Sequence, residues 1–477
     1  MSCERILFVT GRLAERSLRR VVGELGPQLG FDYEVQTLGI SVAALMHCDW
    51  VARKLDFSGR FDRVILPGWC QGDLQLLSDR FGTPFERGPK HVFDLPMYFG
   101  SDVRVSPDLS QYDIEIIAEI NHAPQMNDRE LVAAAESFRD SGADVIDMGC
   151  VAGESWNGTG DAVRLLRREG FRVSIDSFDR REVEAAIDAG AELVLSCNGE
   201  NLSWAAELGV ELVAIPDTPH DTTSLDRTVA ALQERGVRFR VDPILEPIGF
   251  GFAASLSRYF DVRRRWPDVE MMMGIGNVTE LSEADTVGMN LLLAGLCQEL
   301  GIRSVLTTEV INWAKTAVRE FDLARRLAHY SLTNGVLPKH LDPQLVMLRD
   351  SNINEMGAEE LQLLAAQLRD PNFRIFVERG EIHVMNRDGY WRGSDPYVLF
   401  EGMIDGAKPM DPTHAFYLGY ELSKAVTALT LGKQYTQDEA LQWGFLTIPE
   451  TSAKDRRKAR GPRRAGSTTR AADEGGT

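Results

Sequence analysis

Residues 171–198 read FRVSIDSFDRREVEAAIDAGAELVLSCN, and this stretch predicts a strand, a helix and a second strand. A β-branched run before Asp176 forms the first strand, and residues 179–189 carry apolar residues at helical spacing until Gly190 ends the helix. The next apolar run leads into Asn198. Strands joined in this way are parallel, so Asp176 and Asn198 are expected at the carboxyl ends of neighbouring strands.

Each of these two side chains has an ordinary structural explanation. Asp176 would cap the helix that follows it, and Asn198 would bond to the backbone of its loop. Strands of a parallel sheet are buried on both faces, so a carboxylate and an amide at neighbouring strand ends both need polar partners. Because ligands bind at the carboxyl ends of such strands, the pair favours a ligand site.

The alternation of strand and helix repeats along the chain from residue 113. Eight apolar segments with helical patterns after them are predicted to be strands: 114–120, 144–149, 172–176, 193–198, 211–216, 238–243, 271–276 and 304–309. Eight such units predict a closed (β/α)₈ barrel, the TIM-barrel fold.

Polar residues stand at or just beyond the carboxyl end of every predicted barrel strand. They are Asn121, Asp147, Asp176, Asn198, Asp217, Asp242, Asn277 and Glu309. Carboxylates and amides suit an uncharged heterocycle that offers N–H donors, and a pterin fits because its amino group and ring N–H can both donate to one carboxylate. A metal-bound sugar phosphate is the alternative ligand, but no histidine or lysine stands among these strand ends.

Two smaller parts are predicted to flank the barrel. Strands at 5–9, 33–38 and 63–68 indicate a small doubly wound α/β domain, while a hairpin over 373–386 and a helix over 411–433 indicate an α+β module. The predicted division is 1–112 for the first domain, 113–332 for the barrel, 333–450 for the C-terminal module and 451–477 for a disordered basic tail.

Two loops of the first domain contain residues that suit a ligand. Thr10, Gly11 and Arg12 follow the first strand, where backbone amides and a guanidinium could hold a phosphate. Neither GxGxxG nor a P-loop lysine is present to strengthen this interpretation. Residues 67–73, PGWCQGD, form either a second ligand loop or a plain tight turn.

Composition excludes several classes of protein. The 477 residues include 44% hydrophobic residues, enough for about three globular domains. A net charge of −19 argues against a nucleic-acid surface, and no apolar run approaches the roughly 18 residues of a membrane span. Six cysteines without a CxxC pair predict reduced thiols in a cytoplasmic protein.

Residues 113 to about 310 resemble the pterin-binding barrel shared by dihydropteroate synthases and pterin-dependent methyltransferases. The motifs that carry the resemblance are EINHAP (119–124), SGADVIDMG (141–149), VSIDS (173–177), DAGAELVLSCN (188–198), VDP (241–243), EPIGFGF (246–252) and GIGNVTE (274–280). The resemblance implies that Asp176 holds the amino-pyrimidine edge of the pterin, with Asn198, Asp242 and Asp147 beside it. It also implies that Asn121 faces a diphosphate and its Mg²⁺.

The sequence departs from the synthases at two motifs. GIGNVTE stands where a synthase has a Ser-Arg-Lys run, and LTTEV (306–310) stands where it has Arg-x-His. Asn277 instead resembles the methyltransferase asparagine that contacts the pterin near N5. Lys315 and Arg319, one helical turn apart, are possible anion contacts or an ordinary solvated helix face. No residue is assigned as catalytic.

The complete layout resembles the dihydropteroate synthase-related proteins of organisms that use tetrahydromethanopterin. This resemblance implies a transferase that joins a dihydropterin-methyl diphosphate to an arylamine, ribofuranosylaminobenzene phosphate, and that acts as a homodimer. A pterin-dependent methyltransferase remains an alternative, although the chain has no corrinoid-binding Asp-x-His-x-x-Gly motif. A non-catalytic pterin-binding protein is the other alternative.

Overall fold

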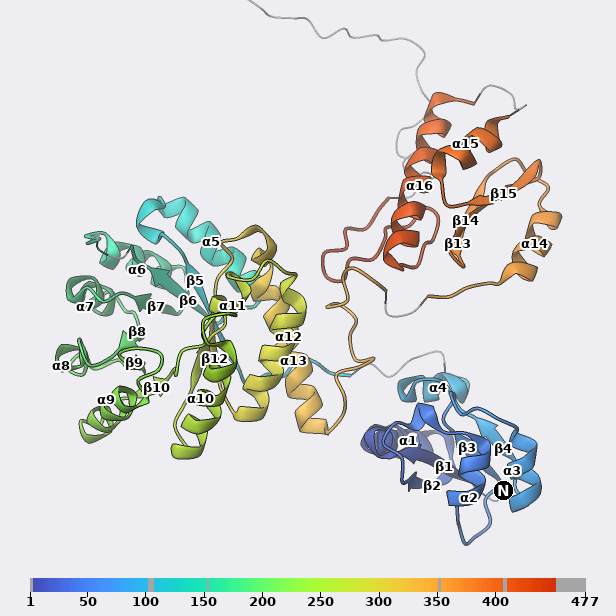
Figure 1. Ribbon diagram of the computed structural model, residues 1–477, viewed down its shortest axis with the longest axis horizontal. Helices are drawn as coiled ribbons and strands as arrows, with labels where there is room; N and C mark the ends of the chain where they lie inside the picture. The colour runs from blue at the N-terminus through green and yellow to red at the C-terminus, as the bar shows by residue number, and fades with distance from the viewer. Residues whose placement is uncertain are drawn as a thin grey trace, which may run out of the picture. The chain divides into compact units, whose positions relative to one another are not determined.

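The computed structural model describes residues 3–101, 107–151, 153, 155–350, 353–405 and 410–451. Contacts within the chain divide it into two units, Met1–Asp342 and Pro343–Thr477. The first unit contains a four-stranded and an eight-stranded sheet, and the second contains a three-stranded sheet (Figure 1). The basic tail is predicted at 451–477, and its residues 452–477 lie outside the described residues. The predicted domain borders stay predictions.

The N-terminal sheet is parallel, with strand order β2-β1-β3-β4. Its strands are β1 (Glu4–Gly11), β2 (Phe31–Leu38), β3 (Arg63–Leu66) and β4 (Phe85–Arg87). The helices are α1 (Glu15–Leu29), α2 (Cys48–Lys54), α3 (Leu74–Phe81) and α4 (Leu95–Tyr98), with 3₁₀ helices η1 (Arg12–Ala14), η2 (Ala43–Leu45) and η3 (Val92–Asp94). Strand β4 is absent from the sequence-based prediction.

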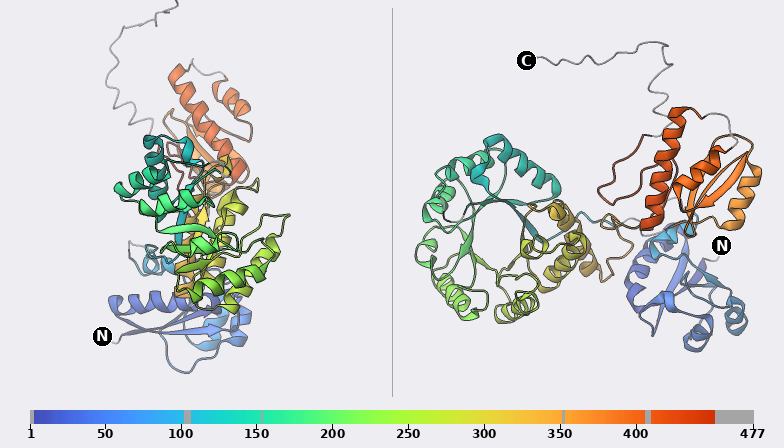
Figure 2. Two further views of the ribbon diagram at one scale, coloured as in Figure 1. Left: turned by 90° about the vertical axis from the view of Figure 1, so that its left-hand side faces the viewer. Right: turned by 45° about the horizontal axis from the view of Figure 1, so that its top comes forward.

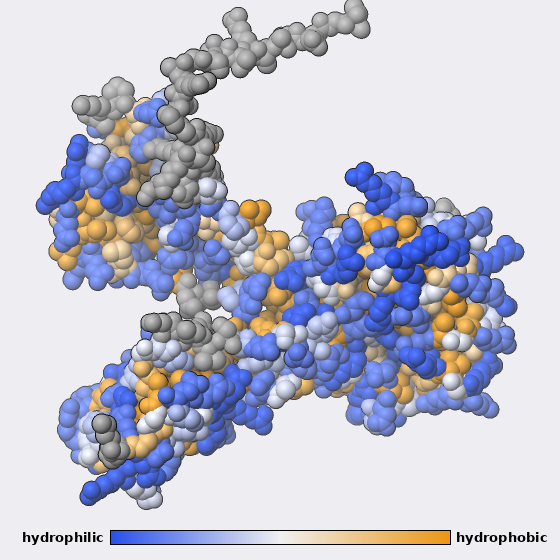
Figure 3. Space-filling view, turned by 180° about the vertical axis from the view of Figure 1, so that it is seen from behind, coloured by the Kyte–Doolittle hydropathy of each residue, from blue (hydrophilic) through white to orange (hydrophobic). Residues whose placement is uncertain are grey.

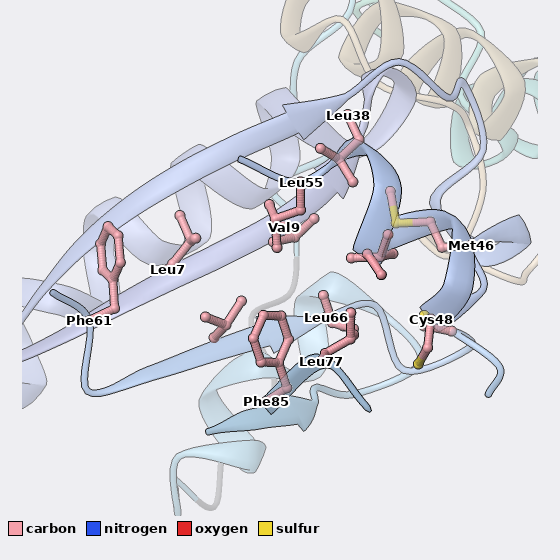
Figure 4. Packing of buried hydrophobic residues seen from close by; sticks show 14 residues of the cluster. Leu7, Val9, Leu38, Met46, Cys48, Leu55, Phe61, Leu66, Leu77 and Phe85 are labelled. Atoms are coloured by element: carbon pink, nitrogen blue, oxygen red, sulfur yellow. The ribbon is translucent and has the colours of Figure 1, made fainter. Parts of the chain in front are cut away.

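Apolar cores lie on both faces of this sheet, as a doubly wound fold requires. On one face, Leu7 and Val9 of β1 and Leu66 of β3 pack against Leu77 of α3 (Figure 4). On the other face, Phe8 and its neighbours pack against α1 and α4. The predicted doubly wound domain is therefore confirmed.

The eight-stranded sheet is parallel and has the order β10-β9-β8-β7-β6-β5-β12-β11. A parallel bridge between Val241 and Met271, with Val241 N donating to Glu270 O at 2.8 Å, brings the two outer strands together and closes the barrel (Figure 2). The strands are β5 (Glu115–Ile120), β6 (Val145–Gly149), β7 (Val173–Asp176), β8 (Leu193–Cys197), β9 (Glu211–Ala214), β10 (Phe239–Val241), β11 (Met272–Gly274) and β12 (Ser304–Thr307). The predicted TIM barrel is confirmed.

Helices surround the barrel on its outside (Figure 2). They are α5 (Asp128–Ser141), α6 (Thr159–Arg168), α7 (Arg180–Asp188), α8 (Leu202–Ala205), α9 (Thr222–Glu234), α10 (Phe252–Arg265), α11 (Gly276–Thr279), α12 (Thr286–Leu300) and α13 (Ala317–Asn334), with 3₁₀ helices η4 (Ala123–Gln125) and η5 (Asn312–Ala314).

The barrel interior changes from apolar to polar along its strands. Ile117 of β5 and Val145 of β6 belong to a buried apolar cluster. Side chains two residues farther along a strand point to the same face, so Glu119 follows Ile117 and Asp147 follows Val145 inside the barrel. Along β5 and β6, polar side chains therefore replace apolar ones toward the carboxyl ends of the strands.

The second unit contains an antiparallel sheet of three strands. These are β13 (Arg374–Glu378), β14 (Glu381–Asn386) and β15 (Gly389–Gly393), and the helices are α14 (Ala358–Gln367), α15 (Pro396–Ile404) and α16 (Pro412–Leu431). Leu418 and Leu422 of α16 pack against Ile382 and Val384 of β14. The predicted hairpin and long helix are confirmed, while β15 was not predicted.

Hydrophilic residues cover most of the molecular face drawn in Figure 3, with small apolar patches between them. Within the described residues, no helix combines the length and apolar character needed to cross a membrane.

Candidate functional site

Asp147 lies inside the barrel, in the layer where the apolar filling ends. The register pairs it with Glu119 on β5 and Ser174 on β7. Ser174 Oγ donates to Asp147 Oδ1 at 2.6 Å, while Asp147 Oδ2 has no hydrogen-bond partner among the described residues. Burial raises the pKa of Asp147 well above its usual value, and the nearby carboxylates of Asp176 and Glu119 raise it further.

Asp176 occupies the next layer, closer to the barrel mouth. It pairs with Gly149 of β6, and a Cβ at Gly149 would lie only 2.6 Å from Glu119 Oε1. The glycine therefore leaves room for Glu119 beside it. Burial, together with Glu119, raises the pKa of Asp176 to about 7. No described group donates a hydrogen bond to the Asp176 carboxylate, so it is available to a ligand.

Asp242 is held more firmly by its surroundings. Its Oδ1 accepts hydrogen bonds from Tyr259 Oη at 2.6 Å and Ile244 N at 2.8 Å, and its Oδ2 accepts one from Gly274 N at 3.2 Å. Burial raises the pKa of Asp242 to about 6, although these hydrogen bonds act in the opposite direction. Its Oδ2, with a single long hydrogen bond, is the atom with remaining capacity for a ligand.

Asn277 lies close to Asp242. A Cβ at Gly274 would be 3.6 Å from Asp242 Oδ2 and 3.9 Å from Asn277 Nδ2, so both side chains approach this glycine. Asn277 Nδ2 donates to Leu245 O at 2.9 Å, and the residue is exposed. The structure therefore brings these two predicted residues together at the end of β11.

Asn198 and Asp217 both take part in the loop after β8. Asn198 Oδ1 accepts from Glu200 N at 3.0 Å, and Asp217 Oδ1 accepts from Gly199 N at 2.8 Å. The expectation that Asn198 bonds to the backbone of its loop is therefore correct for its side-chain oxygen. Its Nδ2 donates to no acceptor among the described residues. Asp217 is exposed and holds the loop, so it supports the site instead of facing into it.

The other two strand-end residues, Asn121 and Glu309, also have local partners. Asn121 Nδ2 donates to Thr308 Oγ1 at 3.3 Å, which leaves its Oδ1 for a ligand. Glu309 Oε1 accepts from Val318 N at 2.9 Å at the start of α13. Burial raises the pKa of Glu309 to about 7.

The two predicted cations differ in their surroundings. Lys315 is exposed, and no described residue forms an ion pair with it. Arg319 Nη1 lies 3.4 Å from Asp322 Oδ2, and Asp322 also binds Arg325 and Arg326. This pairing favours a structural role for Arg319, and its anion contact stays a prediction.

One buried cation near the mouth was missed from the sequence. Arg258 of α10 donates to Pro243 O at 3.3 Å, to Ile244 O at 2.9 Å and to Glu246 Oε2 at 2.7 Å. It ties together the loop that follows β10. Because Glu246 neutralises it, Arg258 does not supply a free positive charge to the mouth.

Glu119 is the other residue that sequence reasoning missed. It lies inside strand β5, two residues before Asn121, and not at the end of the strand, where the candidate residues were predicted. The signal that could have found it is a carboxylate at an inward position of a buried strand. Burial also raises the pKa of Glu119.

No group of three or more histidine, cysteine, aspartate or glutamate side chains in the described part of the chain is arranged to hold a metal ion. Mg²⁺ commonly uses only one or two protein ligands together with substrate phosphates, so this arrangement is compatible with a metal that arrives with a diphosphate. The free Oδ1 of Asn121 is the one predicted metal ligand, and it fits that limited role.

Three segments of the chain match known protein families. Residues 121–291 match pterin binding enzymes, which confirms the resemblance identified from the barrel motifs. Residues 358–438 match the family PterinBD-DUF4346, and residues 4–90 match a family of unknown function, DUF6513.

The chain is also similar to individual proteins. An uncharacterized protein of Methanocaldococcus jannaschii is 25% identical, and the alignment covers 91% of this chain and 98% of that protein. A dihydropteroate synthase from Thermus thermophilus, solved in complex with 6HMPPP, is 21% identical and covers 46% of this chain and 93% of its own, with a TM-score of 0.36. The Yersinia pestis enzyme with a sulfonamide drug complex is 17% identical over 48% of this chain and 96% of its own, with a TM-score of 0.38.

Proposed function

We propose that this protein is a dihydropteroate synthase-like transferase that condenses a dihydropterin-methyl diphosphate with an arylamine. The observation that carries the proposal is the carboxylate of Asp176, which has no hydrogen-bond donor among the described residues and lies at the carboxyl end of β7. Beside it, Asp147 Oδ2 is also without a partner. Both residues lie within the segment that matches pterin binding enzymes.

The pterin would bind through its amino-pyrimidine edge. The Asp176 carboxylate would accept one hydrogen bond from the amino group and one from the adjacent ring N–H, a bidentate arrangement. Asn198 Nδ2 would donate to an acceptor of the ring, because the oxygen of this amide is already used by the loop. Asp242 Oδ2 and Asn277 would contact the heterocycle on the other side of the mouth, where Gly274 separates them.

In the proposed reaction the arylamine nitrogen attacks the methylene carbon of the pterin. A C–N bond forms, the C–O bond to the diphosphate breaks, and the amine loses one proton. The protein would act mainly by holding the two reactants in line and by stabilising the departing anion. Bound Mg²⁺ would neutralise charge on the diphosphate, with Asn121 Oδ1 as its protein ligand, and the exposed Lys315 would supply a further positive charge.

The second substrate is proposed to be ribofuranosylaminobenzene phosphate, for a cofactor of the tetrahydromethanopterin type. The proposal follows the resemblance in overall layout that the sequence motifs suggest. Cytoplasmic location and a homodimer are further proposals from the sequence.

A second candidate function is pterin binding without synthase chemistry, either in a methyltransferase system or as a non-catalytic binding protein. The specific observation in its favour is that Arg258, beside the loop after β10, is paired with Glu246, and that the predicted anion contact Arg319 is paired with Asp322. Asn277 at the end of β11 also suits the methyltransferase alternative.

Diphosphate release distinguishes these functions. Purified protein is incubated with the dihydropterin diphosphate, Mg²⁺ and ribofuranosylaminobenzene phosphate, and released diphosphate and condensed product are quantified together. A synthase releases diphosphate in a 1:1 ratio with product and only when both substrates are present. Pterin binding without product, with a preference for a methylated reduced pterin, would support the second candidate instead.

A further inference from the structure

The N-terminal sheet has a crevice at the carboxyl ends of β1 and β3. The two strands pair only over residues 6–8 of β1 and 63–65 of β3, so they are no longer paired beyond Phe8 and Ile65. The chain order also reverses here, because β2 lies on one side of β1 and β3 lies on the other. Open α/β sheets bind ligands at this topological switch point.

A cavity of about 110 Å³ occupies the crevice. Its inner wall is apolar and includes Phe8, Leu18 and Ile65, which are all buried. The outer lining includes Trp69, which is 44% exposed, and Lys90. The volume is comparable to that of a cavity of about 150 Å³ that holds benzene, so it suits a single ring.

The walls of this cavity are held in place by backbone contacts between loops. Gly88 N donates to Leu66 O at 2.9 Å and Gly68 N donates to Pro89 O at 3.3 Å. A Cβ at Gly68 would lie 2.5 Å from Gly88 O, so only glycine permits this close approach. The cavity is therefore preformed, and a ligand would not need to order its walls.

The phosphate site considered at residues 10–12 has one amide that is already used, because Arg12 N donates to Ile40 O at 2.9 Å. The next amide along the chain, Leu13 N, donates to Ser41 O at 3.1 Å. Arg12 Nη2 donates to Ser41 Oγ at 2.8 Å. Arg12 does not line this cavity, and the positive charge of the cavity comes from Lys90.

Lys90 is available to an anion. Its ammonium lies 4.5 Å from the centre of the Trp69 ring, and no carboxylate in the described part of the chain pairs with it. The residues that line the cavity include no aspartate or glutamate, although the chain as a whole carries a charge of −19. An aromatic ligand would stack or pack against Trp69, and its negative group would reach Lys90.

We propose that this cavity is a binding site for a small anion that carries one aromatic ring. The apolar inner wall takes the ring, Trp69 covers its outer edge, and Lys90 pairs with a carboxylate or phosphate group. Most residues of the site lie in the segment 4–90, which matches a family of unknown function. The site does not depend on the function proposed for the barrel.

Calorimetric titration of the full chain with benzoate tests the proposal, with benzamide as the uncharged analogue. We expect one saturable site for benzoate with a Kd of about 1 mM or tighter. Benzamide should bind at least tenfold more weakly, because it lacks the charge that pairs with Lys90. Absence of saturable benzoate binding, or equal binding of both compounds, would overturn the proposal.

Two variants locate the site. Lys90→Gln removes the charge from an exposed position and should weaken benzoate at least tenfold, while Lys54→Gln on α2 should leave it unchanged. Ala43→Leu fills the cavity and should abolish binding. Benzoate binding that persists in Lys90→Gln would place the anion elsewhere and overturn the proposal, even if Ala43→Leu does not fold. Diphosphate release by Lys90→Gln, measured separately, reports on the barrel alone.

Discussion

Ser174 Oγ donates a 2.6 Å hydrogen bond to Asp147 Oδ1 inside the barrel, and Asp147 Oδ2 has no partner among the described residues. A buried carboxylate oxygen without a hydrogen bond is costly, so its persistence needs an explanation. Asp176, in the next layer, likewise has no donor within the described part of the chain. We infer that these two carboxylates are kept for a ligand that supplies N–H donors.

Asp176→Ala should reduce pterin affinity about a hundredfold, or roughly 3 kcal/mol. The reason is the loss of two charge-assisted hydrogen bonds to the amino-pyrimidine edge. Calorimetry with the pterin measures the affinity, and circular dichroism checks the fold. Asp140→Ala, an exposed position on α5, is the control and should leave affinity unchanged. Equal affinity of folded Asp176→Ala and wild type would remove Asp176 from the site.

Asp147→Asn should make stability less dependent on pH. In the folded protein the pKa of Asp147 lies well above its usual value of 3.8. The protonated carboxyl therefore stabilises the fold at low pH. This contribution is lost as the pH rises toward the pKa of the folded state. Asparagine does not titrate, so the variant should gain up to about 1.4 kcal/mol relative to wild type for each pH unit in this range. Urea unfolding at pH 5, 6 and 7 measures the difference. Parallel stability curves would contradict the explanation.

Pterin affinity should rise with pH and level off above about pH 7. Asp176 has a pKa near 7 before the ligand binds, and only the ionised form accepts two hydrogen bonds. Below that pH the affinity should fall by up to about tenfold per unit. Titrations of wild type and Asp176→Asn between pH 5.5 and 8.5, with the same pterin, separate this effect from titration of the ligand. If Asp176→Asn showed the same pH dependence of pterin affinity as wild type, another titrating group would be responsible.

Arg258→Met should destabilise the barrel by about 3 kcal/mol or more, because Glu246 would remain buried without its charged partner. Arg227→Met removes a more exposed pair with Asp217, separated by 3.6 Å, and should cost less than about 1 kcal/mol. Chemical denaturation gives both values. The double variant Arg258→Met/Glu246→Met should recover most of the loss, and a failure to recover would mean that Arg258 acts mainly through its bonds to the loop carbonyls.

Lys315→Ala should weaken binding of the pterin diphosphate about fivefold to tenfold, without changing the affinity for a pterin that lacks the diphosphate. The exposed Lys315 is free to approach an anion, whereas Arg319 is held by Asp322. Arg319→Ala should therefore leave both affinities nearly unchanged. Competition titrations with the two pterins measure the effects. A larger loss for Arg319→Ala would reverse the assignment.

Periodicity in the sequence predicted the barrel well. Eight runs of apolar residues separated by helical patterns fit few folds other than a (β/α)₈ barrel. The observed strands begin and end within a few residues of the predicted ones. Strand β4 was missed because it has three residues, Phe85–Arg87, directly after a proline. Strand β15 was missed because glycines stand at both of its ends.

The site was less accessible to sequence reasoning. Strand ends locate the mouth, so Asp147, Asp176 and Asp242 could be predicted as candidates. Which oxygen remains free depends on partners far away in the chain, such as Tyr259 for Asp242. A position at the end of a strand also does not show whether a polar side chain supports a loop, as Asp217 does, or faces the ligand.

The most direct test of the central claim is a calorimetric titration of the wild-type protein with the dihydropterin diphosphate, with and without Mg²⁺, followed by ribofuranosylaminobenzene phosphate. We predict pterin binding that Mg²⁺ strengthens, and then heat from turnover accompanied by release of diphosphate. The synthase function would be contradicted if pterin affinity did not depend on the diphosphate or on Mg²⁺ and if no turnover followed the addition of the arylamine. No binding of pterin at all would contradict the assignment of the barrel mouth.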